Sequence, residues 1–248
     1  MKRKIQIFKD LQELSLAAAE LFVDTAAQAI ATRGRFLTAL SGGGTPKPLY
    51  QLLAHTPYCD QIEWSKVHAF WGDERCVPHN DPGNNYFQAK QALFDHVPLP
   101  LENIHRAASE LEPGDAAHDY ARVLNTFAEA PLAWPRFDLV LLGMGDDGHT
   151  ASLFPGSQVD ITSPVVAVTA NYQSRPANRV SLTPRVFNSA RRVIFLVSGA
   201  DKAVTLTQVL SDISNMDLLP AQRIRPTDGE VIWLVDEAAA SKAQKNIR

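Results

Sequence analysis

The sequence predicts a single α/β domain, over residues 1–248, built on a mostly parallel, doubly wound (Rossmann-like) sheet with helices on both faces. Short apolar runs alternate with segments of helical periodicity along nearly the whole chain, as repeated βα units do. The 248 residues fit one large domain of this class. Hydrophobic residues make up 45% and charged residues 21%, so a sizeable core can form. No internal repeat, low-complexity tract or long linker divides the chain.

The first predicted elements are a long helix, a short strand and a second helix. Apolar residues recur at spacings of three and four from Leu11 to Ala29, and this stripe ends before Gly34. A strand at 36–40 is stopped by a glycine loop, after which Thr45 offers an N-cap and the next proline a first-turn residue. The alternation continues with strands at 67–71, 137–142, 165–169, 179–183, 193–197 and 231–235, and with helices at 84–95, 116–128, 184–190, 201–210 and from 237 onward.

The composition argues against several classes of function. The net charge of −3 gives no general attraction for nucleic acid or an acidic membrane, so an anionic ligand needs a local cluster of cations. Cys59 and Cys76 match no metal pair and suit a reducing compartment. Acidic residues follow the basic first residues, where a signal peptide would have an apolar core. The longest apolar run, at 139–142, is far shorter than the roughly 20 residues that span a bilayer. We expect a soluble, cytoplasmic protein with no nucleic-acid or membrane partner.

A glycine-rich loop follows the first predicted strand, where a parallel sheet binds its ligands. The loop runs from Ser41 to Thr45 and contains three consecutive glycines. Gly43 and Gly44 let the backbone approach a ligand closely, and the predicted helix start favours an anion such as phosphate. The loop matches neither the lysine-containing P-loop nor the dinucleotide G-x-G-x-x-G pattern, so it does not indicate a nucleotide.

Two further loops place titratable groups directly after predicted strands. Asp73, Glu74 and Arg75 follow one strand and face the ligand-binding edge by the geometry of the fold. Asp147 precedes His149 by two residues in a glycine-rich turn after the most apolar strand. An aspartate at this spacing can accept the imidazole N–H and leave the other nitrogen free as a base. We interpret Asp147 and His149 as part of the catalytic apparatus that a hydrolase needs, and the other six histidines as structural or surface residues.

Two cations, Arg179 and Lys202, complete the predicted positive cluster. Both lie near the ends of predicted elements, Arg179 at the start of a strand and Lys202 at the start of a helix. No serine stands in a G-x-S-x-G setting, and no H-x-x-x-H or paired-cysteine motif offers a metal site. A hydrolase with this sequence would use water as its nucleophile, and we expect no cofactor and no metal ion.

Five stretches in fixed order form a set of motifs that spans nearly the whole chain. They are Ser41 to Pro46, Gly72 through Asn85-Tyr86, Gly143 to Pro155, Arg179 to Thr183, and Trp233 to Ala240. The third stretch follows the pattern Gly-Met-Gly-x-Asp-Gly-His-Thr-Ala-Ser-Leu-Phe-Pro, with Asp146 at x, and its length argues against coincidence. Together these motifs resemble the 6-phosphogluconolactonases of the pentose phosphate pathway.

The resemblance implies the fold of glucosamine-6-phosphate deaminases and the reaction of 6-phosphoglucono-δ-lactone with water to give 6-phosphogluconate. The small-molecule partner is then a phosphorylated sugar lactone, and the enzyme a monomer or small homo-oligomer. The implied roles fall on His149 as base, Asp147 as its partner, Arg75 as an active-site cation, and Ser41, Gly43, Gly44, Thr45, Asp73, Arg179 and Lys202 as substrate- or phosphate-binding residues.

Two positions depart from the family pattern. Gly44 stands where the family commonly has serine or another polar residue, which puts one hydroxyl contact to the phosphate in doubt. Asn84 replaces a usual serine, but both residues cap helices, so we expect a small consequence.

Alternatives remain at this point. An amino-sugar-phosphate isomerase/deaminase needs a carboxylate base near the sugar C2, and Arg75 disfavours it because the deaminases compared have an aromatic residue there. A non-catalytic sugar-phosphate sensor needs no Asp147–His149 pair, yet no helix-turn-helix or basic segment accompanies this domain. The sequence also leaves open whether Arg75 faces developing negative charge or neutralises nearby carboxylates.

Overall fold

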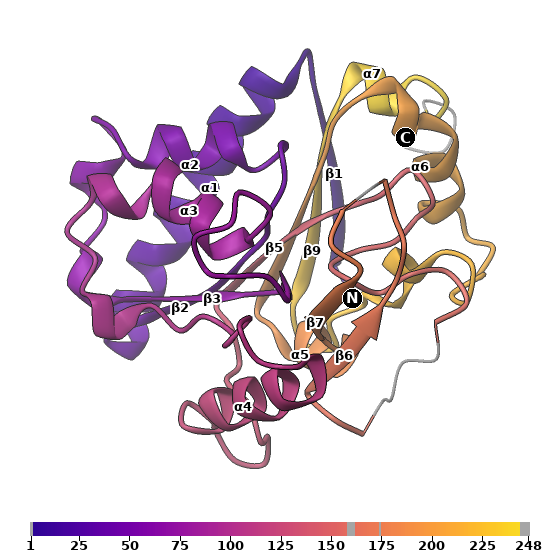
Figure 1. The fold of residues 1–248 in the computed structure, drawn as a ribbon. Helices are drawn as coiled ribbons and strands as arrows, with labels where there is room; N and C mark the ends of the chain where they lie inside the picture. Colours follow the sequence, from indigo (N-terminus) through magenta and orange to yellow (C-terminus); the bar gives the residue numbers. More distant parts are fainter. Residues whose placement is uncertain (1, 158–161, 174, 244–248) are drawn as a thin grey trace.

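Six parallel strands form the central sheet of this protein, in a computed structural model that describes residues 2–157, 162–173 and 175–243. They are β1 (Lys2–Phe8), β2 (Phe36–Leu40), β3 (Val67–Trp71), β5 (Leu139–Gly143), β8 (Arg192–Val197) and β9 (Glu230–Asp236), in the order β1-β9-β8-β5-β2-β3 (Figure 1). The chain moves outward from β2 to β3, and later from β5 to β8 and β9. The topological switch point therefore lies between β2 and β5, where a doubly wound sheet binds ligands.

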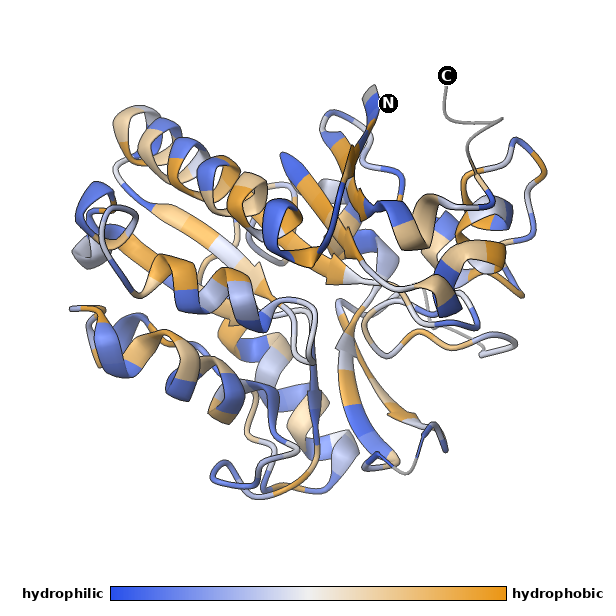
Figure 2. Cartoon of the chain, turned by 90° about the horizontal axis from the view of Figure 1, so that it is seen from above, coloured by the Kyte–Doolittle hydropathy of each residue, from blue (hydrophilic) through white to orange (hydrophobic). Residues whose placement is uncertain are grey.

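Both faces of the central sheet are buried, because helices cover them, and successive side chains of each strand point into opposite cores. Leu139 and Leu141 pack into one core, and Val140 and Leu142 into the other. The first core lies under α1 (Leu11–Arg33), α2 (Lys47–Leu53) and α3 (Asn85–Ala92); the second lies under α4 (Pro113–Asn125), α5 (Pro184–Ser189), α6 (Ala203–Val209) and α7 (Glu237–Ala240). Figure 2 shows the strands as predominantly hydrophobic, whereas hydrophobic and hydrophilic residues alternate along the helices. The predicted fold class is confirmed.

A second, three-stranded antiparallel sheet lies beside the first, in the order β4-β7-β6. Its strands are β4 (Asp73–Arg75), β6 (Val165–Thr169) and β7 (Asn178–Leu182). The expectation that β6 and β7 join the parallel sheet is wrong, as is the interpretation of 73–75 as a loop. No helix lies among the described residues between β6 and β7, so the chain returns directly and the two strands pair antiparallel.

Several predicted boundaries differ from the structure. The strand β1 was not predicted; it pairs with β9 at the sheet edge, where Arg3 and Lys4 remain exposed. The second helix begins at Lys47, and Thr45 makes no capping hydrogen bond, because a turn precedes the helix. The expected helices at 84–95 and 201–210 divide into α helices and short 3₁₀ turns. The two turns are Phe94–His96 and Ala200–Lys202; further 3₁₀ turns in the described chain are Cys59–Gln61, Trp64–Lys66, Leu101–Asn103 and Pro220–Arg223.

Among the described residues, α1 is the one helix with the length and composition to cross a membrane. Sequence reasoning overlooked it because acidic residues interrupt its apolar run. Half of its apolar window is buried inside the protein, and Leu14, Ala18 and Phe22 pack against the sheet. A core helix of a soluble protein passes the same compositional test, and the packing of α1 is that of a core helix.

Asp236 ties the ends of β8 and β9 together beside the segment that carries Lys202. Its carboxylate accepts the Ala239 N–H at 2.7 Å, which caps α7, and the Gly199 N–H at 3.1 Å. The Ser198 hydroxyl donates to the same carboxylate. This buried side chain therefore fixes two strand-end loops at once.

We expect Asp236→Ala to lower the free energy of unfolding by about 2 kcal/mol, because buried donors lose their acceptor. Urea denaturation measures the change. The exposed Asp212 provides a matched control, whose alanine variant should differ from wild type by no more than about 0.5 kcal/mol. Equal stability of the two variants would contradict the assigned role of Asp236.

Candidate active site

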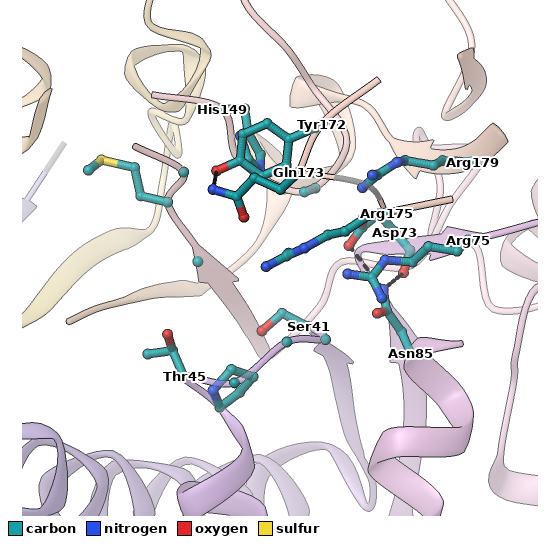
Figure 3. A pocket seen from close by; sticks show the side chains of 18 of the residues that line it. Ser41, Thr45, Asp73, Arg75, Asn85, His149, Tyr172, Gln173, Arg175 and Arg179 are labelled. Atoms are coloured by element: carbon teal, nitrogen blue, oxygen red, sulfur yellow. Dashed lines mark hydrogen bonds between the residues drawn. The ribbon is translucent and has the colours of Figure 1, made fainter. Parts of the chain in front are cut away.

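One pocket opens at the switch point, between the carboxyl ends of the parallel strands and the small antiparallel sheet (Figure 3). Nine of the ten site residues predicted from the sequence line it, and Asp147 lies behind it, bonded to His149. The lining residues are Ser41, Gly42, Gly43, Gly44, Thr45, Pro46, Asp73, Arg75, Asn85, Gly143, Met144, Gly145, His149, Ala151, Tyr172, Gln173, Arg175, Arg179 and Lys202.

Two buried tyrosines hold the strand ends that lead into the pocket. The Tyr50 hydroxyl donates to the Ser41 carbonyl at 2.6 Å and accepts its N–H at 3.1 Å. The Tyr120 hydroxyl bridges the N–H and carbonyl of Trp71 in the same way, at 2.8 and 3.0 Å. Burial raises the pKa of both hydroxyl groups well above the usual value for tyrosine, so both remain donors.

The glycine loop approaches α3 so closely that Gly42 is required. A Cβ at Gly42 would lie 1.8 Å from the Asn85 side-chain oxygen, whereas a Cβ at Gly44 would meet nothing within 4 Å. A serine at position 44 would therefore fit, so packing does not explain the departure from the family pattern. Gly43 adopts φ +98°, and its N–H donates to Gln88 at 3.0 Å.

Glu74 organises the segment that follows β4. Its buried carboxylate accepts N–H groups of Arg75 and Asn85 at 2.7 Å and of Tyr86 at 2.8 Å. Burial raises the pKa of Glu74 to about 7, although the three backbone donors oppose this shift. Asn84 caps α3 by accepting the Phe87 N–H, as expected from the sequence.

Arg75 and Arg179 face each other across the pairing of β4 with β7. Their exposed fractions are 6% and 2%. Arg75 donates to the Gly83 carbonyl at 2.6 Å and Arg179 to the Pro176 carbonyl at 2.9 Å, but Nε of Arg75 and Nη2 of Arg179 have no partner among the described residues. No described carboxylate forms an ion pair with either guanidinium, which argues against a charge-neutralising role for Arg75. Burial is the main cause of the lowered pKa of Arg179. The positive charges of Arg75 and Arg175 lower it further, whereas the negative charge of Asp73 raises it.

His149 is positioned by the tight turn after β5. Its Nδ1 lies 2.6 Å from Asp147 Oδ1, which also accepts the His149 backbone N–H at 3.0 Å. Burial favours a raised pKa for Asp147, but the hydrogen bonds from His149 outweigh it, and the pKa lies below its usual value. Gly148 adopts φ +86°, and a Cβ at Gly145 would lie 2.1 Å from the imidazole. Both glycines are therefore needed for this turn.

Asp73 and Lys202 border the pocket on different sides. Asp73 accepts the Ser152 hydroxyl at 2.7 Å and lies close to the Asn85 amide. Lys202 ends a 3₁₀ turn, and its ammonium group lies 2.9 Å from exposed Asp201. The pocket thus combines a buried carboxylate, a histidine and several cations.

Three residues of the pocket, Tyr172, Gln173 and Arg175, lie outside all five motif stretches, and sequence reasoning missed them. They lie between β6 and β7, which sequence reasoning placed in the parallel sheet. Figure 3 shows Arg175 extending into the pocket between His149 and Arg75. The available signal was a run of polar and cationic residues just before Arg179. Within the described ranges, no group of three or more His, Cys, Asp or Glu residues has the arrangement of a metal site.

Comparison with known proteins gives one consistent family. The family model for glucosamine-6-phosphate isomerases/6-phosphogluconolactonase matches residues 9–233. The chain is 38% identical to a 6-phosphogluconolactonase of Nostoc sp. over 98% of its length and 99% of the relative, and 41% identical to one of Synechocystis sp. over 86% of each. The three-dimensional structure of 6-phosphogluconolactonase from Trypanosoma brucei superposes with a TM-score of 0.83, at 30% identity over 97% of this chain and 98% of that one. This chain therefore belongs to the glucosamine-6-phosphate isomerase/6-phosphogluconolactonase family.

Proposed function

We propose that this protein is a 6-phosphogluconolactonase, which hydrolyses 6-phospho-D-glucono-1,5-lactone to 6-phosphogluconate in the pentose phosphate pathway. The observation that carries the proposal is the Asp147–His149 pair beside a pocket with buried, unpaired guanidinium nitrogens. The names of the similar proteins support the same activity. We also propose a cytoplasmic enzyme of one domain; the pairing of β1 with β9, from the two ends of the chain, supports one domain.

The phosphate of the substrate is assigned to Arg179 and Lys202 with the glycine loop. The unpartnered Nη2 of Arg179 is a buried donor, and such donors are costly unless a ligand accepts their hydrogen bond. An anion meets this need best, because hydrogen bonds between ions are stronger than those between neutral groups. The loop from Ser41 to Thr45 brings backbone groups to the same pocket. The assignment does not depend on the dipole of α2, which has only seven residues.

The chemical step uses His149 as a general base. Because Nδ1 faces Asp147, Nε2 is the nitrogen that takes a proton from water. The water oxygen attacks the lactone carbonyl, and the resulting oxyanion is stabilised by a cation, to which we assign Arg75. The bond between the carbonyl carbon and the ring oxygen then breaks. The imidazolium returns its proton to the ring oxygen, which becomes a hydroxyl group, and the new carboxylic acid ionises.

The first test follows acid release from freshly made 6-phosphogluconolactone against its spontaneous hydrolysis. We expect an enzyme-dependent rate well above this background. Ammonia release from glucosamine 6-phosphate is measured in parallel, because Asp73 places a carboxylate in the pocket as a deaminase would need. Deaminase activity without lactonase activity would overturn the proposal.

His149→Ala should lose about 10²- to 10⁴-fold in kcat while KM stays within a few-fold, because the base acts only in the chemical step. Asp147→Asn should also be defective, since the amide can present an N–H where the carboxylate accepts one. The wild-type rate should fall in acid as the imidazole takes up a proton. Steady-state kinetics after subtraction of the spontaneous rate measures these effects. Near-wild-type kcat for a folded His149→Ala would refute the mechanism.

Arg179→Ala and Lys202→Ala should mainly raise KM, by about 10- to 100-fold, because a phosphate remote from the carbonyl is bound similarly in ground and transition states. Lys66→Ala is the control, since this exposed lysine lies at the amino end of β3, whereas the pocket lies at the carboxyl ends of the strands. Unchanged KM in both variants would show that Arg179 and Lys202 do not bind the phosphate.

Activity should survive exhaustive chelation, because the proton acceptor in the proposed step is an imidazole. The assay compares enzyme before and after dialysis against a chelator, with added divalent metal as a control. Loss of activity that metal restores would contradict the mechanism.

A further inference from the structure

Two aromatic rings, besides Asp147, lie beside the imidazole of His149. The Phe154 ring lies 4.6 Å from it, between centroids, at an interplanar angle of 34°. The Tyr172 ring lies 4.6 Å from it at 77° (Figure 3). The His149 side chain is only 12% exposed. A single hydrogen bond at Nδ1 leaves the ring free to rock about that bond, whereas aromatic neighbours restrict this motion by packing. Tyr172 therefore lies where it can set the orientation of the base.

Tyr172 is anchored to the same loop that carries His149. Its hydroxyl donates to Asp146, and the Asp146 backbone carbonyl accepts the Thr205 hydroxyl of α6. Burial and the hydrogen bond to Asp146 raise the pKa of Tyr172 far above its usual value, so the hydroxyl remains a donor. The same hydrogen bond is the main cause of the lowered pKa of Asp146. Asp146 occupies the position x that the motif leaves open, and its side chain has no part in the mechanism above.

We propose that Tyr172 is a positioning residue for His149: its hydroxyl, anchored on Asp146, holds the aromatic ring against the imidazole and keeps Nε2 directed at the attacking water. The proposal rests on the proposed function for its kinetic consequences. The Tyr172 hydroxyl also accepts the Gln173 side-chain N–H at 2.9 Å. It acts on the imidazole through its anchor on Asp146, whereas the ring acts on the imidazole directly.

The kinetic test compares single and double variants. Tyr172→Ala should lower kcat about 10- to 100-fold with KM within threefold, because a displaced base costs rate. Tyr172→Phe and Asp146→Ala should each lower kcat about 3- to 10-fold, as expected for one lost hydrogen bond, and the double variant should match either single. Asp146→Asn, which keeps an acceptor, should retain more activity than Asp146→Ala. Tyr58→Ala, at a partly buried tyrosine outside the pocket, controls for loss of a ring.

The conservative variant separates positioning from a merely structural role. Tyr172→Phe keeps the ring beside the imidazole, so its kcat should exceed that of Tyr172→Ala by at least about threefold, while KM stays within threefold in both. Unchanged kcat in Tyr172→Ala, fully additive losses in the double variant, or a rise in KM alone would each overturn the proposal.

Chemical modification tests the geometry without relying on activity. Diethyl pyrocarbonate acylates uncharged imidazole nitrogens, and peptide mapping by mass spectrometry follows each histidine separately. His149 should react at least about threefold faster in Tyr172→Ala than in wild type, once its shielding ring is gone. His79, whose side chain is 56% exposed, should react equally in both. Equal reactivity of His149 overturns the proposal. An inactive wild-type enzyme with the expected reactivity change overturns only the lactonase assignment.

Discussion

The pairing of β4 with β7 is the constraint on which the rest of the site depends. It places Arg75 directly opposite Arg179 in a buried antiparallel ladder, and like charges at such positions destabilise a sheet. The Gly83 carbonyl accepts a hydrogen bond from Arg75, and the Pro176 carbonyl accepts one from Arg179. Asp73 lies near enough to offset some of the positive charge of Arg179. Buried nitrogens of both side chains still lack partners among the described residues. A bound anion would balance this arrangement, so the protein retains a costly charge pair at the place where its proposed substrate is negative.

The two sheets supply different parts of the chemistry. The parallel sheet contributes the glycine loop after β2 and the His149 turn after β5, which meet because the strand order reverses between them. The antiparallel sheet contributes the guanidinium groups from the facing side. Buried groups connect the two sheets. Ser152 donates to Asp73, and the Phe154 ring lies 4.6 Å from the His149 ring and 5.2 Å from the Arg179 guanidinium. Packing between the sheets, rather than one flexible loop, therefore sets the distance between His149 and the guanidinium groups.

Much of this fold could be predicted because its strands are short, continuous apolar runs between helices with clear periodicity. The central strands β2, β3, β5, β8 and β9 were all predicted to within a few residues. The edge strand β1 was missed because it begins with three charged residues, and β4 was missed because three polar residues resemble a turn. The error over β6 and β7 was of another kind. Residue pattern identifies a strand, but strand direction depends on how the connecting chain returns.

The sequence by itself determined which residues carry the proposed chemistry and that they gather at one edge of the sheet, because parallel strands end together and the glycine, Asp147–His149 and Arg75 segments each follow such a strand. Their catalytic roles stay predictions. Tertiary structure alone decided that Arg75 opposes Arg179, that no described carboxylate pairs with either, and that Tyr172 reaches His149 from 23 positions along the chain. These relations depend on pairing between strands and packing between side chains distant in sequence, and no local pattern of residues records them.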